Sequence, residues 1–253
     1  MKITFLGTGT SQGVPVIACS CEVCSSADLR DKRLRVSVLI EYEGKVIVID
    51  SGPDFRYQML RAGVSHLDAI VFTHEHKDHV AGLDDVRAFN YKQQSEIDVF
   101  AHKRVQEALK REFPYIFSDD KYPGVPLINL HEINNYPFKV AGIDFLPVEV
   151  MHFKMPVLGF RIADFTYITD AKIVSEEEKM KIKGSKIVVI NALQKEKHIS
   201  HFTLDEAIAF AKEIGAEKTY FTHLSHRMGT HTEISKLLPP GIELAFDGLV
   251  LQL

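Results

Sequence analysis

Four potential metal ligands lie within six consecutive positions of the sequence, at His74, His76, Asp78 and His79. In an extended segment residues two apart share a face, so His74 and His76 can present their imidazoles to one point. Asp78 and His79 follow where the chain can turn and approach from a second direction. Imidazole and carboxylate groups bind zinc, iron or manganese. Because four ligands exceed what one segment needs to supply to a mononuclear site, the motif predicts two adjacent metal ions.

Three more candidates stand at the ends of strand-like runs. His152 ends the run VEVMH, Asp170 follows FTYIT, and His223 follows TYFT. Each alone is a weak signal, because strand-end histidines and aspartates often form only local hydrogen bonds. Together they repeat one arrangement, an apolar strand with a potential ligand at its end. A rigid sheet commonly positions an active site in this way.

The three cysteines of the chain, Cys19, Cys21 and Cys24, lie within six residues. An odd number so closely spaced favours metal binding in a reducing compartment over disulfides. Structural zinc takes four ligands, and histidine often supplies one, which makes His226 a candidate. The alternative is that the cysteines are simply small buried residues. A closed zinc site would hold the loop at about residues 10–35.

His201 precedes a predicted helix whose N-cap is Thr203, with Glu206 completing a capping box. The helix macrodipole disfavours a charged histidine at this end, which suits a group that exchanges protons near neutral pH. The alternative is a surface histidine with only local hydrogen bonds. His198 is expected to be solvated.

The elements that must position these residues are mostly short strands. Strands are predicted at residues 2–6, 37–42, 45–50, 67–72, 98–101, 138–140, 143–149, 158–163, 166–168, 186–191 and 218–222, with two more at the end of the chain. Helices are predicted at residues 55–62, 83–91, 103–113, 175–181 and 204–214. Glu43-Gly44 is a two-residue hairpin signal. Because both halves carry both types, the pattern favours a layered α/β (α+β) architecture over a simple doubly wound fold.

Composition excludes several classes of protein. The 253 residues are 45% hydrophobic and 25% charged, as in ordinary globular proteins, and no linker divides them, so we expect one domain over residues 1–253. The formal charge of −4 gives no general basic field, so nucleic acid is a less favoured partner. No run approaches the roughly 20 apolar residues of a membrane span, and no signal peptide is evident. We therefore expect a cytoplasmic protein without membrane contact, and a homodimer is left open.

The HxHxDH motif at residues 74–79, with Asp50 before it and His152, Asp170 and His223 after it, resembles the metallo-β-lactamase superfamily of metal-dependent hydrolases. The resemblance covers nearly the whole chain and implies a four-layer αββα sandwich with the site along one edge. Asp50 would orient a histidine rather than bind metal. One implied metal site consists of His74, His76 and His152. The other consists of Asp78, His79 and His223, and Asp170 would bridge the two.

The segments GTGTSQGVPVIACSCEVC and THLSH are similar to those of phosphodiesterases of the carbon–phosphorus lyase pathway. This similarity implies a structural zinc bound by Cys19, Cys21, Cys24 and His226. It also implies two active-site ions, zinc or manganese, and hydrolysis of a small or cyclic phosphodiester by a hydroxide that bridges them. His201 would act at the leaving group, and Asp78 would accept the proton of the attacking water.

Other activities use the same metal motif. Alternatives are an endonuclease that trims transfer-RNA 3′ ends, a relative of pyrroloquinoline quinone biosynthesis protein B, and a thioester or lactam hydrolase. The endonucleases recognise RNA through a long basic arm, and the sequence has no such insertion. A non-enzymatic metal-binding module is disfavoured, because a degenerate member would be expected to lose some of the seven dinuclear ligands.

Overall fold

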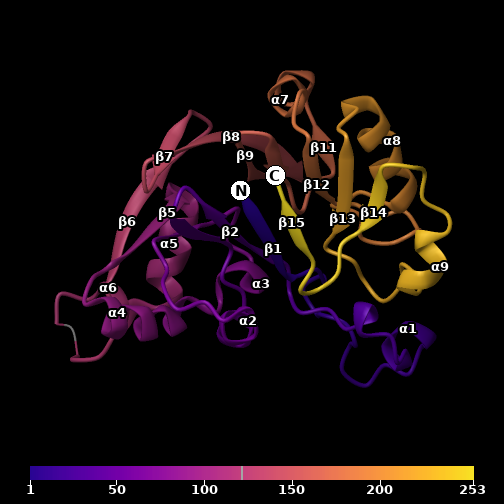
Figure 1. Cartoon of the computed structure of the whole chain (residues 1–253). Helices are drawn as coiled ribbons and strands as arrows, with labels where there is room; N and C mark the ends of the chain where they lie inside the picture. Colours follow the sequence, from indigo (N-terminus) through magenta and orange to yellow (C-terminus); the bar gives the residue numbers. More distant parts are fainter. Residues whose placement is uncertain (121) are drawn as a thin grey trace.

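Two β-sheets pack face to face in the computed structural model, which describes residues 1–120 and 122–253 (Figure 1). The first sheet runs in the order β15 (Val250–Gln252), β1 (Lys2–Gly7), β2 (Ser37–Tyr42), β3 (Lys45–Ile49), β4 (Ala69–Val71), β5 (Ile97–His102) and β6 (Ile128–Ile133). The second runs in the order β11 (Ile173–Val174), β8 (Ile143–His152), β9 (Met155–Ile162), β10 (Phe165–Tyr167), β12 (Ile187–Asn191), β13 (Lys218–Thr222) and β14 (Ile242–Leu244), and β7 (Phe138–Val140) pairs with β8.

Alternating apolar residues explain why both faces of the first sheet are covered. In β3, Ile47 and Ile49 join the core between the sheets, whereas Val48 points to the opposite face and packs under the helices. In β2, Leu39 likewise joins the layer under the helices. Successive side chains of a strand point to opposite faces, so such continuous apolar strands require cover on both sides.

Helices supply that cover on the outer face of each sheet (Figure 1). Beside the first sheet lie α2 (Phe55–Ala62), α3 (Lys77–Val80), η2 (Leu83–Val86), α4 (Arg87–Gln93), α5 (Lys103–Glu112) and α6 (Pro114–Phe117). Beside the second lie α7 (Glu176–Ile182), α8 (Leu204–Ile214) and α9 (His231–Ser235). The cysteine loop contains α1 (Glu22–Ser25) and η1 (Leu29–Asp31). The predicted αββα sandwich is thus confirmed.

Local signals in the sequence account for several element ends. Helix α2 ends at Gly63, whose φ of 65° lies in the left-handed region that glycine adopts readily. Helix α8 begins with the predicted capping box, in which Thr203 and Glu206 each accept a hydrogen bond from the other's backbone N–H. The hairpin between β2 and β3 turns at Glu43 and Gly44, with φ of 50° and 75°. The predicted helix over residues 55–62, the capping box and the hairpin are thus confirmed.

Other boundaries differ from the predictions. Residues 83–91 are not one α-helix: they begin with the 3₁₀ turn η2, whose start is held by a hydrogen bond from Gly82 N to Ser51 O. Strand β8 continues to His152 because it pairs with β9 along its length. Strand β6 was not predicted, because its sequence INLHEI mixes polar and apolar residues, and it is an edge strand paired with β5.

The two ends of the chain meet at one edge of the first sheet (Figure 1). Strand β1 pairs antiparallel with β15, and the Met1 ammonium donates to the Leu253 carbonyl over 2.7 Å. Within residues 1–120 and 122–253, none of the helices combines the length and apolarity needed to cross a lipid bilayer.

Candidate metal centre

Six of the seven predicted ligands of the dinuclear site bring their donor atoms together in groups at or just beyond the ends of β4, β8, β10 and β13, whereas His76 is exposed and reaches the cluster only through ring contacts. The His74 ring centroid is 4.7 Å from that of His76, and the His76 ring is 5.2 Å from that of His152. On the other side, the His79 and His223 rings stack at 6.0 Å. A hydrogen bond from Leu158 N to Thr73 O joins the two sheets beside this cluster.

Donor atoms in the second group have spacings that suit one metal ion. Asp170 places Oδ2 3.3 Å from His79 Nε2 and Oδ1 3.3 Å from His223 Nε2. Asp78 Oδ2 lies 3.3 Å from the same His79 atom and 3.6 Å from His223 Nε2. Ligands bound at about 2.0–2.1 Å in a tetrahedron are separated by about 3.3 Å. These distances therefore match a coordination shell.

Unsatisfied buried nitrogens point to the same conclusion. Within the described residues, Nε2 of His74, His79 and His223 is buried and has no hydrogen-bond partner. Leaving such an atom unpaired costs about 1–3 kcal/mol. Three of them facing carboxylates form a donor set that fits divalent metals.

Asp50 fixes which nitrogen of two histidines remains free. Its Oδ2 accepts hydrogen bonds from His79 Nδ1 over 2.7 Å and from the Thr73 hydroxyl over 2.8 Å. Since that hydroxyl donates to Asp50, it accepts from His74 Nδ1, which lies 3.0 Å away. Both imidazoles therefore carry their proton on Nδ1 and keep Nε2 for a metal. Thr73 was not among the predicted site residues, although it stands directly before the motif.

His152 is oriented by backbone rather than by a carboxylate. Its Nδ1 donates towards the carbonyl oxygens of Asp170 and Ser200, each at 3.0 Å. Because Nδ1 holds the proton, Nε2 is left without one. His152 thus presents the same free nitrogen as His74 and His79.

His201 lies against the site, and His198, which was expected to be solvated, is half-buried beside it and keeps part of its surface exposed. His201 is buried, and its Nε2 is 2.9 Å from Asp170 Oδ1. On its other side, Nδ1 is 3.0 Å from Ser200 Oγ and 3.2 Å from His198 Nδ1. His198 is half-buried because this contact packs it against His201. Its role as a neighbour of His201 depends on tertiary packing, which the sequence did not reveal.

Burial and charge set the protonation of the cluster. Burial raises the pKa of Asp170, but the nearby His223 and His79 outweigh it and hold that pKa well below its usual range. Burial lowers the pKa of His201, and Asp170 only partly opposes this. For His74, burial is the main cause that lowers the pKa. The cluster therefore pairs ionised carboxylates with neutral imidazoles on its His74 and His201 sides.

Close backbone contacts hold α3 against the Asp50 loop. A Cβ on Gly52 would lie 2.0 Å from the Asp78 carbonyl oxygen, and one on Gly82 would lie 2.1 Å from the Gly52 oxygen. Only glycine permits this approach. Asp50, Asp170 and His223 also adopt positive φ, between 57° and 64°, which costs of order 1 kcal/mol for a non-glycine residue. Strain of this kind is common at functional sites.

The three cysteines meet His226 in a second cluster. His226 Nδ1 lies 3.2 Å from Cys19 Sγ and 3.5 Å from the sulfurs of Cys21 and Cys24. A hydrogen bond from the Cys24 backbone lowers the pKa of Cys21 to about 6, whereas burial raises that of Cys24 to about 11. The four donor atoms lie close enough to share one metal ion. The loop that carries them lies beside α9 (Figure 1), where Arg30 donates to Thr232.

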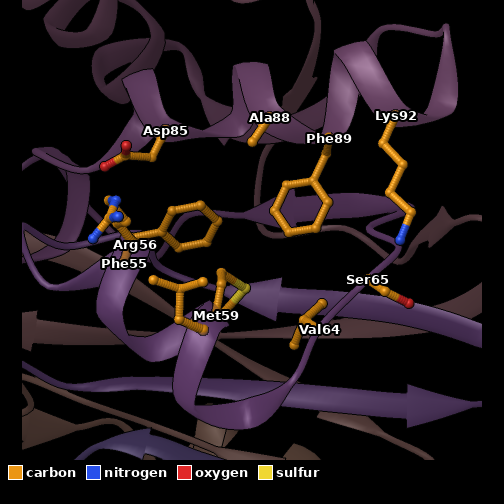
Figure 2. A pocket seen from close by; sticks show the side chains of 10 residues that line it. Phe55, Arg56, Met59, Val64, Ser65, Asp85, Ala88, Phe89 and Lys92 are labelled. Atoms are coloured by element: carbon orange, nitrogen blue, oxygen red, sulfur yellow. The ribbon is translucent and has the colours of Figure 1, made fainter.

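Two surface hollows differ in chemistry. A cleft of about 540 Å³ opens at the His76 and His152 side of the cluster, and its lining includes Phe153, Lys154 and Ile199. A separate groove of about 400 Å³ lies between α2 and α4. Figure 2 shows Phe55, Met59, Val64 and Phe89 converging in that groove, which contains no histidine. Of these two hollows, the cleft is the one that adjoins the histidine cluster.

Comparison with known proteins agrees with this geometry. The family model described as "Beta-lactamase superfamily domain" matches residues 45–224, so the chain belongs to the metallo-β-lactamase superfamily. A solved structure titled as a new diphosphatase from the PhnP family is 39% identical, covers 100% of this chain and 97% of its own, and has a TM-score of 0.94. Within the superfamily, the chain is therefore PhnP-like.

Two further proteins are similar to the chain, one in sequence over about half of its own length and one in fold. A Porphyromonas gingivalis protein named octanoyltransferase is 41% identical over 252 residues, which is 98% of this chain but 51% of that protein. The chain spans about half the length of this relative, so its name assigns no activity to the chain. Zinc-bound PqqB from Methylobacterium extorquens is 19% identical, with all of both chains covered and a TM-score of 0.82. At that identity the likeness concerns the fold.

Proposed function

We propose that the protein is a metal-dependent phosphodiesterase that hydrolyses small or cyclic phosphodiesters. The observation that carries this proposal is the position of Asp170. Its two carboxylate oxygens each lie 3.3 Å from a histidine nitrogen, and its Oδ1 also contacts His201. A carboxylate in this position suits a dinuclear centre that opens into a cleft.

In this proposal the donor groups form two metal sites. His74, His76 and His152 would hold one ion, Asp78, His79 and His223 the other, and Asp170 would belong to both. When bound, such ions polarise phosphoryl oxygens and lower the pKa of water towards neutrality. Zinc and manganese both suit imidazole and carboxylate ligands. A third ion, a structural zinc, would be held by Cys19, Cys21, Cys24 and His226, closing the loop at about residues 10–35.

The protein's own side chains would move the protons. His201 Nε2 lies 2.9 Å from Asp170 Oδ1, so the imidazole would stand beside the departing oxygen; because burial lowers its pKa, it would first have to take up a proton there before delivering one. Asp78 is mostly buried between His79 and His223, and it would accept the proton of the attacking water. Asp50 and Thr73 would keep the metal-facing nitrogens of His79 and His74 free of protons.

A second candidate is hydrolysis of a diphosphate. The PhnP-family structure with a TM-score of 0.94 is titled a diphosphatase. A phosphoanhydride also presents a phosphoryl group with a good leaving group, so the same residues would serve. With either substrate, we propose that the protein acts on a small molecule, that residues 1–253 form one domain and that the protein is cytoplasmic. A homodimer stays a prediction.

The test compares substrates on protein of known metal content. We expect activity towards bis(p-nitrophenyl) phosphate and nucleoside 2′,3′-cyclic phosphates, and none towards a β-lactam. His76→Ala should abolish the activity, whereas His66→Ala, an exposed histidine beside Asp68, should retain it. Activity confined to a diphosphate would favour the second candidate. Activity confined to a β-lactam or a thioester would overturn both.

A further inference from the structure

We propose that Phe153 and Lys154 form a subsite for a planar heteroaromatic group of the substrate, such as a nucleobase. This inference rests on the proposed function and narrows its substrate class to nucleotide-type esters. Phe153 and Lys154 are the two turn residues of the hairpin between β8 and β9, in which His152 pairs with Met155. The subsite therefore begins one residue beyond a candidate metal ligand.

The backbone of Phe153 is unusual for an aromatic residue. Its φ is 56°, in the left-handed region that favours glycine. At two other tight turns of the chain the corresponding residues are Ala141, followed by Gly142, and Ala163. A bulky ring at such a position is strained, yet Phe153 is 48% exposed and belongs to none of the buried core clusters. Strain without a packing benefit indicates a role in binding.

The cleft supplies a second apolar surface for such a group. Ile199 lines the same cleft and is 66% exposed. It comes from the segment between β12 and α8, so it reaches the cleft independently of the hairpin. Large apolar side chains exposed in a concave site next to polar groups are typical of ligand pockets. An aromatic face accepts any base by stacking.

Lys154 adds a positive charge that is available to a ligand. Its Nζ lies 5.3 Å from the Phe153 ring centroid. Among the described residues no ion pair involves Lys154, whereas Arg104 in the same cleft already contacts Glu75 and the Pro156 carbonyl. The Lys154 ammonium is thus placed to meet a phosphate that is not the one cleaved. Together the two turn residues match a base and an adjoining phosphate.

The test uses two cyclic diesters with the same reactive ring, adenosine 2′,3′-cyclic phosphate and glycerol 1,2-cyclic phosphate. We expect Phe153→Ala to lower the ratio of their kcat/KM values, adenosine over glycerol, by about 5- to 150-fold, chiefly through KM. Phe153→Tyr should restore the ratio, because its ring also stacks. Tyr136→Ala, which removes an exposed aromatic ring from the loop between β6 and β7, is the matched control and should leave the ratio unchanged.

Binding of adenosine 5′-monophosphate, measured by calorimetry on metal-loaded protein, separates this inference from the proposed function. If the wild type cleaves both diesters and Phe153→Ala leaves their ratio unchanged, the inference is overturned and the proposed function stands. If neither diester is cleaved, the proposed function fails. A Phe153→Ala protein that then binds the monophosphate at least fivefold more weakly still supports the subsite, and an unchanged Kd overturns it.

Discussion

Replacing Asp50 by asparagine should loosen metal without disturbing the fold. Asp50 is buried and accepts hydrogen bonds from His79 Nδ1, the Thr73 hydroxyl and the Thr73 N–H. Asparagine keeps the shape and one acceptor, so it can retain the bond from Thr73 N. Its amide group, however, places N–H donors opposite His79 Nδ1, which lies 2.7 Å from the present oxygen. Two donors cannot share that position.

His79 must then carry its proton on Nε2, the atom 3.3 Å from the carboxylates of Asp78 and Asp170. A protonated Nε2 cannot bind metal. Loss of a supporting partner of this kind typically weakens metal affinity about 10- to 100-fold, or about 1.4–2.7 kcal/mol. We therefore expect Asp50→Asn to lose metal at correspondingly lower chelator concentration.

The assay is dialysis against graded chelator, followed by elemental analysis and a competition measurement of the metal Kd. Asp54→Asn is the matched control, because Asp54 is a neighbouring carboxylate that contacts Arg35 rather than a histidine. It should hold metal as the wild type does. If Asp50→Asn retains metal as well as Asp54→Asn does, Asp50 does not set the proton position on His79 and acts only as part of the scaffold.

Three other outcomes are expected. His201→Ala should keep its active-site metals but slow hydrolysis, most for substrates with poor leaving groups, and loss of metal in this variant would show that His201 is a ligand instead. Cys24→Ser should lose one zinc equivalent and become more sensitive to proteolysis in residues 10–35, while a full metal complement would contradict the structural zinc. Burial and the charge of Arg33 lower the pKa of His231 to about 4. Because the unfolded chain binds that proton from about pH 6.5 downwards, stability should fall as the pH falls, by about 2 kcal/mol between pH 7.5 and pH 5. Urea unfolding at both pH values should show this component disappearing in His231→Gln; an identical pH dependence in the variant would disprove it.

Local spacing made part of the site predictable. Two metal-ligand motifs, residues 74–79 and residues 19–24, were predicted because each is a short-range pattern. Each depends only on one turn or on the end of one strand. The capping box at Thr203 is of the same kind. The association of His226 with the cysteines was also anticipated, because the segment THLSH is similar to that of phosphodiesterases whose structural zinc uses this histidine.

Features that depend on contacts between distant segments were not predictable. Thr73 acts through Asp50, which lies 23 residues earlier and comes close only when β3 pairs with β4. The contact of His198 with His201 was not predicted, because it depends on His201 packing against Asp170. Phe153 was not predicted as a binding residue, because nothing in the sequence distinguishes it from other exposed aromatic residues. Only its positive φ in the structure does so.

The meeting of the chain ends has a consequence for the architecture of larger proteins. Met1 and Leu253 lie side by side, so the first and last residues of the chain are within hydrogen-bonding distance. A short linker could join the ends, and new ends could be opened at the exposed turn of Ala141 and Gly142 without cutting a strand. A second domain attached before Met1 or after Leu253 would emerge from the same corner, beside β15 at the edge of the first sheet. Gene fusion in either order would therefore place the added domain on the same side of the hydrolase fold.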